Sequence, residues 1–150
     1  LVLLGKGDGT FKPLRLDQSG FLLPGDAKAL ALTDLNGDAR PEVVATVNSS
    51  SPKVFLNRVA SGKPLAVRLT GPKGNLRGIG SRVTLHLKSG KSLVGEIASG
   101  NSYLTGGSPV LFLAIPEGEE AIGITVRSPL GKVSRHEVPS GVSELALQLD

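Results

Sequence analysis

The chain of 150 residues contains no cysteine, methionine or tryptophan, and only one tyrosine and four phenylalanines. Without cysteine it has neither disulfide bonds nor thiolate metal ligands. No apolar run reaches the roughly 20 residues of a membrane-spanning helix. The scarcity of aromatic rings also disfavours binding sites built on stacking against bases. Any metal site in this chain must therefore use oxygen or nitrogen ligands.

Glycine and proline are plentiful, with 20 and 10 residues, and they separate short runs of alternating or β-branched residues. This pattern predicts many short strands joined by tight turns. We predict an all-β fold: a propeller-blade-like antiparallel unit over residues 1–60 and a small β-sandwich or barrel over residues 61–150. The boundary lies in the Ser- and Gly-containing stretch 58–63. The predicted strands span residues 1–4, 11–16, 29–33, 43–47, 53–57, 64–70, 80–87, 91–98, 110–115, 121–127, 132–138 and 142–149.

The most distinctive stretch spans residues 34–42, between two predicted strands. Oxygen-bearing side chains recur there at every second position and once more at its end. Calcium takes six to eight oxygen ligands, and Gly37 permits a sharp turn. The pattern predicts a Ca²⁺ site whose ligands are Asp34, Asn36, Asp38, the backbone carbonyl of Arg40, and Glu42.

An ordinary polar turn is the alternative for this stretch, because Asp, Asn and Gly are common turn residues. The spacing is not that of an EF-hand, which needs Glu at loop position twelve, where this chain has Ala45.

The net charge of +4 is concentrated in the second part of the chain, where five of the ten cations fall between residues 73 and 91. They predict an anion-binding site, with a solvated face as the alternative. The candidate residues are Lys73, Arg77, Arg82, Lys88 and Lys91. The strand–turn–strand pattern over 83–98 also resembles an Sm- or SH3-like hairpin, so an RNA-binding small β-barrel is an alternative function. Only Tyr103 and Phe112 could stack on bases in this half, which makes nucleic acid an unlikely partner.

His86 and His136 are the two histidines, each on a predicted strand and out of phase with its apolar neighbours. We expect both on the surface. Sequence order does not decide against a Ser-His-Asp triad, but no serine lies in a Gly-x-Ser-x-Gly elbow. We expect no enzymatic activity.

The first 57 residues resemble an FG-GAP/VCBS-type repeat, the blade of an integrin α-like β-propeller. The resemblance rests on Leu-Val-Leu-Leu at 1–4, Gly-Asp-Gly-Thr-Phe at 7–11, Ala-Leu-Thr-Asp-Leu-Asn-Gly-Asp at 31–38 and Val-Phe-Leu-Asn at 54–57. It implies calcium in the loop at residues 34–42, on the same five ligands. Ala39 stands where such repeats usually have Gly, and Glu42 where they usually have Asp.

The later residues resemble an ASPIC/UnbV domain, which commonly follows FG-GAP repeats, as in cartilage acidic protein and its bacterial relatives. The resemblance rests on the motifs at 65–71, Asn75, 78–83, 100–104 and 124–131, the last with Ser128 in place of the usual Trp. It implies a non-catalytic calcium-associated adhesion module with a protein or glycan partner, located extracellularly, at the cell surface or in the periplasm. Because the chain begins with Leu1, we expect a C-terminal fragment of a longer repeat protein with an export signal upstream.

Overall fold

The computed structural model describes residues 1–59, 61–100 and 105–149. Strands hold 46% of the residues and helix only 3%, which confirms the predicted all-β class. No helix in these three ranges is long and apolar enough to cross a membrane. The strands of the described residues are β1 (Val2–Gly5), β2 (Phe11–Leu14), β3 (Ala27–Thr33), β4 (Glu42–Val47), β5 (Lys53–Phe55), β6 (Lys63–Thr70), β7 (Arg82–Leu87), β8 (Ser92–Glu96), β9 (Val110–Ile115), β10 (Ala121–Arg127), β11 (Val133–His136) and β12 (Glu144–Gln148).

Each predicted strand corresponds to one of these strands, with ends that differ by a few residues. A single helical turn, α1 (Leu16–Ser19), begins at the last residue of the predicted strand 11–16 and continues into the stretch between that strand and the next. The side chain of Gln18 accepts a hydrogen bond from Arg15 N–H at 3.1 Å, and Gly20 ends the turn in the left-handed region at φ 62°. One turn of four residues is too short to carry an amphipathic pattern, so periodicity alone does not show it.

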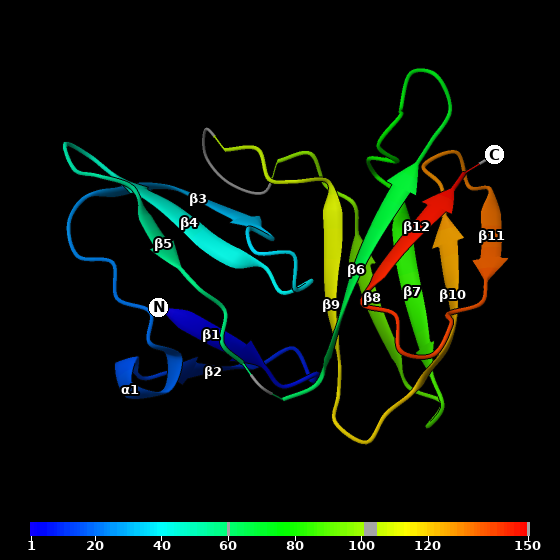
Figure 1. The fold of residues 1–150 in the computed structure, drawn as a ribbon, viewed down its shortest axis with the longest axis horizontal. Helices are drawn as coiled ribbons and strands as arrows, with labels where there is room; N and C mark the ends of the chain where they lie inside the picture. The colour runs from blue at the N-terminus through cyan, green and yellow to red at the C-terminus, as the bar shows by residue number, and fades with distance from the viewer. Residues whose placement is uncertain (60, 101–104, 150) are drawn as a thin grey trace.

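The first 59 residues form two antiparallel sheets at one end of the molecule (Figure 1). β1 and β2 make a hairpin, while β3, β4 and β5 follow one another in a three-stranded meander. The predicted antiparallel pairing is confirmed. The strands lie in two separate sheets rather than in a single blade.

The second part of the chain forms two sheets that face each other. One has the order β12-β6-β9, with β6 parallel to β12 and antiparallel to β9. The other has the order β11-β10-β7-β8 and is antiparallel throughout. None of the sheets in the described residues closes into a barrel. The sandwich alternative is therefore confirmed, and the small-barrel alternative is wrong, because the hairpin β7–β8 lies at one side of an open sheet.

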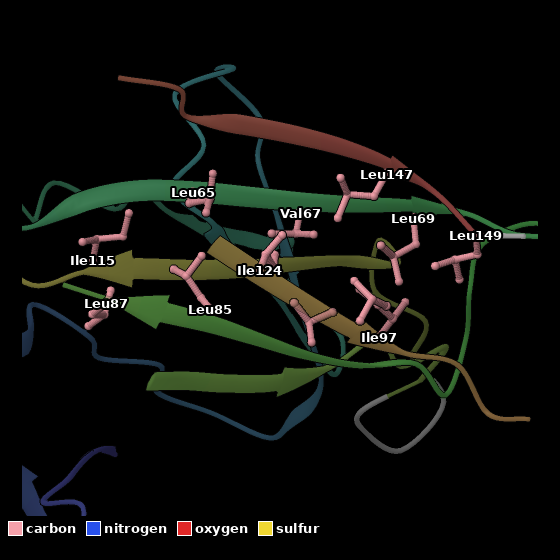
Figure 2. Close-up of a cluster of buried hydrophobic side chains, with 12 residues drawn as sticks. Leu65, Val67, Leu69, Leu85, Leu87, Ile97, Ile115, Ile124, Leu147 and Leu149 are labelled. Carbon is pink, nitrogen blue, oxygen red and sulfur yellow. The ribbon is translucent and has the colours of Figure 1, made fainter. Parts of the chain in front are cut away.

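The hydrophobic core fills the space between these two sheets (Figure 2). Alternate residues of β6 and β7 point inward, including Leu65, Val67, Val83 and Leu85, none of which has exposed surface. This is the period-two pattern that the sequence shows. The buried cluster consists of Leu65, Val67, Leu69, Val83, Leu85, Leu87, Ile97, Ile115, Ile124, Val126, Leu147 and Leu149.

The first 59 residues bury far less apolar surface. Their buried apolar side chains are small ones, Ala39, Ala45 and Val47. Large apolar side chains are exposed on the strands and in the segments between them, namely Leu1, Leu3, Leu4, Phe11, Leu16, Leu22, Leu30, Leu32, Leu35, Val54, Leu56 and Val59. The two parts of the chain therefore differ in how completely each encloses a core of its own.

Candidate functional site

The predicted calcium loop joins β3 to β4. The pairing of these strands ends at Thr33 and Glu42, so the loop begins and ends at adjacent positions. Gly37 and Ala39 both have left-handed backbones, with φ of 79° and 63°. These two residues reverse the direction of the backbone within the loop. At Ala39 the left-handed conformation is disfavoured, because the residue carries a Cβ atom.

Asp34 organises this loop through its carboxylate. Its Oδ1 accepts hydrogen bonds from the backbone N–H groups of Gly37 at 2.7 Å and Asp38 at 3.3 Å, and its Oδ2 accepts one from Ala39 at 2.9 Å. Partial desolvation raises the pKa of Asp34, but these backbone hydrogen bonds outweigh it and hold the pKa below its ordinary value. The folded loop therefore favours the negative charge at Asp34.

Asn36 and Asp38 lie beside this carboxylate. Asn36 Oδ1 accepts from the N–H of Asp38 at 3.2 Å, the same group that bonds Asp34 Oδ1. Asp38 accepts from Asn36 Nδ2 at 3.2 Å and from the N–H of Arg40 at 2.8 Å. Three predicted ligand side chains thus gather around one short piece of backbone.

Glu42 is fully buried. Its Oε2 accepts from the N–H of Leu35 at 2.8 Å, and its Oε1 accepts from the N–H of Asn57 at 3.4 Å. A buried carboxylate needs such donors to offset the loss of water. Glu42 therefore ties the start of the loop to the segment that follows β5.

The side chain of Arg40 connects the loop to the segment that precedes β6, at the start of the second part of the chain. Its Nε donates to the carbonyl of Val59 at 2.9 Å, and its Nη2 donates to the carbonyl of Gly62 at 3.3 Å. Gly62 directly precedes β6. The predicted calcium ligand is the backbone carbonyl of Arg40, so the side chain is free for this second task.

The donor chemistry of the loop suits a hard cation, since every candidate ligand is an oxygen. Within the three described ranges, no group of three His, Asp or Glu side chains is arranged to hold a metal. The fit therefore rests on two carboxylates, Asp34 and Asp38, with the Asn36 amide oxygen and the Arg40 carbonyl. Asp34 and Glu42 both use their two carboxylate oxygens as acceptors for backbone N–H groups, and Glu42 differs in that its side chain is fully buried.

The structure does not bring the five predicted anion-binding residues together. Lys73 and Arg77 lie in the loop before β7, and Arg82 is the first residue of that strand. Lys88 and Lys91 lie in the turn at its other end, about 20 Å away for six residues of strand. Lys88 also pairs with Glu120 at 3.1 Å.

The two histidines lie on different faces of the four-stranded sheet. His86 is on the outer face, where its ring nitrogens lie 3.3 Å from Ser92 Oγ and 2.8 Å from Thr125 Oγ1. His136 pairs across the strands with the buried Ile124, so it lies on the inner side at the sheet's edge. Both histidines are half-buried. His86 lies on the outer face of the sheet, whereas His136 lies on the core side of the edge strand β11, so the expected surface placement fits His86 better than His136.

A sequence model of the family described as ASPIC and UnbV matches residues 71–149, more than half of the chain. The chain belongs to the ASPIC and UnbV family. Domains of this family are generally found in extracellular or secreted proteins. No curated protein matches the chain. The family match does not reach residues 1–70, so the FG-GAP/VCBS resemblance of the first 57 residues stays a prediction.

Two residues of the ASPIC/UnbV motifs, Asn75 and Ser128, form hydrogen bonds that shape the local backbone. Asn75 binds Ile79 twice, accepting from its N–H at 2.8 Å and donating to its carbonyl at 2.9 Å. Ser128, which replaces the usual Trp, shapes the turn after β10 by accepting from the N–H of Lys132 at 3.2 Å. The motif at 100–104, including Tyr103, lies largely outside the described residues.

Sequence reasoning did not single out Arg127 and Arg135 of this ASPIC/UnbV domain. Arg127 pairs directly with Arg82 across β10 and β7, and Arg135 pairs with Thr125 across β11 and β10. Alternation along each strand indicates which face each arginine takes. The register that places Arg127 opposite Arg82 and diagonal to Arg135 belongs to the tertiary structure.

Proposed function

We propose that this chain is a non-catalytic, calcium-binding, extracellular binding or adhesion module, acting outside the cell, at its surface or in the periplasm. The observation that carries the calcium proposal is the arrangement of Asp34, Asn36 and Asp38 around one backbone turn. The location is supported by the family, whose domains are generally found in extracellular or secreted proteins. The proposed partner is a protein or a glycan.

In this proposal calcium is held by Asp34, Asn36, Asp38 and the Arg40 carbonyl, with water completing the shell. Glu42 supports the loop through its two backbone hydrogen bonds, and it contributes less than the other ligands to the binding of the ion. Affinity for calcium rises with the number of charged ligands and with the rigidity of the site. A site with two direct carboxylates belongs to the weak class of extracellular modules, with a dissociation constant on the order of 10⁻⁴ to 10⁻³ M.

Calcium binding to the folded loop should stabilise the chain by mass action. At about ten times the dissociation constant, one site contributes roughly 1.4 kcal/mol. We expect the thermal midpoint of the intact chain to rise by about 3–6 °C. The measurement is thermal unfolding in calcium and in chelator, with calorimetric titration of calcium into the folded chain.

Asp34→Asn and Asp38→Asn should each remove most of this stabilisation, and Glu42→Gln should reduce it less. Asp17→Asn is the matched control, because Asp17 is an exposed carboxylate of α1 that lies outside the loop and pairs with Arg15. Equal midpoints in calcium and chelator, together with no heat of binding, would show that the loop is an ordinary turn.

A further inference from the structure

The outer face of the four-stranded sheet carries a group of arginines that form no ion pair with any residue the structure describes. Arg82, Arg127 and Arg135 are all exposed and are called the arginine face below. The ion pairs found in the described residues use Arg15, Lys28, Arg68 and Lys88 instead. Three charges of one sign therefore remain available on one surface of the domain.

Strand register shows how close these arginines are. Arg82 and Arg127 are direct cross-strand partners, which places their Cβ atoms about 4.5–5.5 Å apart. Arg135 pairs with Thr125, two residues along β10 from Arg127, so it is the diagonal neighbour of Arg127. Like charges directly opposite each other destabilise a sheet, and an anion bound between them would relieve the repulsion.

The neighbouring side chains suit an anionic polymer. Thr84 and Thr125 pair with each other in the next row of the same face and supply hydroxyl groups, of which Thr125 Oγ1 also lies 2.8 Å from His86 Nε2. Glu96, opposite Arg82, is the one acidic side chain among the paired strand residues of this face, and it makes no ion pair within the described residues. The face is thus positive, with hydrogen-bond donors beside the charges.

We propose that the arginine face binds a sulfated polysaccharide. Arginine presents paired donors that match the oxygens of an oxyanion, and threonine hydroxyls can bond the sugar. Single-stranded nucleic acid needs aromatic rings on which its bases stack, and the paired strand residues of this face include no Phe, Tyr or Trp. The ring of His86 on this face is half-buried and lies within hydrogen-bond distance of Ser92 and Thr125. A protein partner usually needs a buried aromatic or apolar centre, whereas the exposed large apolar side chains on the strands of this sheet, among the described residues, are the scattered Val94, Ile122 and Val133.

This inference names the partner class for the proposed binding module and rests on that function. It does not depend on the calcium loop, which lies in the other part of the chain. The binding experiments are therefore performed in chelator. Loss of the calcium effect and loss of polysaccharide binding are then separate results.

The experiment measures binding of heparin to the full chain by calorimetry across a series of salt concentrations. The triple variant Arg82→Gln, Arg127→Gln and Arg135→Gln should lose about tenfold or more in affinity and show a weaker dependence on salt. The control is Lys6→Gln, Lys12→Gln and Lys53→Gln, which removes the same charge from exposed positions in the first part of the chain. It should change the affinity by less than about twofold.

A second variant, Arg82→Lys, Arg127→Lys and Arg135→Lys, keeps the charge but removes the paired donors. It should show an intermediate affinity, and thermal unfolding confirms that each variant is folded. Absence of heparin binding by the natural chain, or equal losses in the two glutamine triples, would overturn the proposal. So would tighter binding of single-stranded RNA or polyglutamate than of heparin.

Discussion

At the residue scale, two carboxylates of the loop at 34–42 have different surroundings and different hydrogen-bond partners. Asp34 is partly exposed and holds three backbone N–H groups of the loop itself. Glu42 is fully buried and holds N–H groups from two separate segments. The sequence pattern predicts both side chains as calcium ligands. The depth of each side chain distinguishes them, and depth depends on how β5 and the following segment cover the loop.

The first residue-scale prediction concerns acid. The pKa of Asp34 lies below its ordinary value of 3.8, so its ionised form stabilises the folded chain above about that pH. This stabilisation is lost as the pH falls through the lower pKa of the folded state. The difference in free energy of unfolding between the natural chain and Asp34→Asn should therefore close in that acidic range. Urea unfolding in chelator at a series of pH values measures it.

Asp17→Asn reports the effect of removing an exposed carboxylate elsewhere. A constant difference between the natural chain and Asp34→Asn down to the lowest pH at which both fold would contradict the hydrogen-bonding account.

Ser81 supplies the second residue-scale prediction. It has no exposed surface, and its hydroxyl has no hydrogen-bond partner among the described residues. A buried polar group without a partner costs about 1–3 kcal/mol. Ser81→Ala should therefore leave the free energy of unfolding unchanged or raise it by about 1 kcal/mol, as measured by urea unfolding.

Ser134→Ala is the control, because the Ser134 hydroxyl lies 3.0 Å from His136 Nε2. That substitution should lower stability by about 0.5–1.5 kcal/mol. If Ser81→Ala were the more damaging of the two, the Ser81 hydroxyl must have a partner such as a buried water.

At the scale of elements, alternation was enough to locate the strands. Val83, Leu85 and Leu87 alternate with polar residues, and all three are buried. Leu147 and Leu149 behave in the same way. Neighbour relations between strands were not predictable, because pairing joins residues that are distant in sequence. The parallel pairing of β6 with β12 links positions near residues 66 and 144.

The element-scale prediction concerns the place where β8 and β9, from opposite sheets, approach each other closely. Gly95 of β8 pairs with Val83, so it faces the opposite sheet, and a Cβ atom there would clash with the side chain of Leu111 in β9. Gly95→Ala should lower the free energy of unfolding by about 1–3 kcal/mol. Leu111→Ala should make room, so the double variant should lose less stability than the sum of the two single variants.

Gly123→Ala is the control for this cycle. It lies in β10 of the same sheet, and its nearest neighbour for a new Cβ is the His136 carbonyl at an ordinary 3.6 Å. Its stability should change little. Strict additivity of the Gly95 and Leu111 substitutions would show that the two side chains do not share space.

At the scale of the whole molecule, one part of the chain encloses a core and the other leaves its apolar side chains exposed. All twelve residues of the core cluster lie between Leu65 and Leu149. β6 precedes the family match at 71–149, yet it is the central strand of its sheet. A folding unit must therefore begin before the matched range.

We predict that residues 62–150 fold alone and that residues 1–60 do not. The first fragment keeps both sheets of the sandwich, and a domain of that size can be stable. The second keeps a hairpin and a three-stranded meander whose larger apolar residues are exposed. Amide dispersion in NMR spectra and thermal unfolding of each fragment measure the difference. Cooperative melting of residues 1–60 as a monomer, or a random-coil spectrum for residues 62–150, would contradict it.

The sequence by itself determined the all-β class, the approximate strand positions and the inward phase of residues such as Leu85, because alternation is a local property of the chain. It also predicted that oxygen-bearing side chains share one tight loop, because Gly37 permits a sharp turn between two predicted strands. Tertiary structure alone decided that Glu42 is buried, that Arg127 lies between Arg82 and Arg135, and that Lys88 lies at the far end of β7. Register and sheet packing fix these relations, and both depend on contacts between residues distant in sequence.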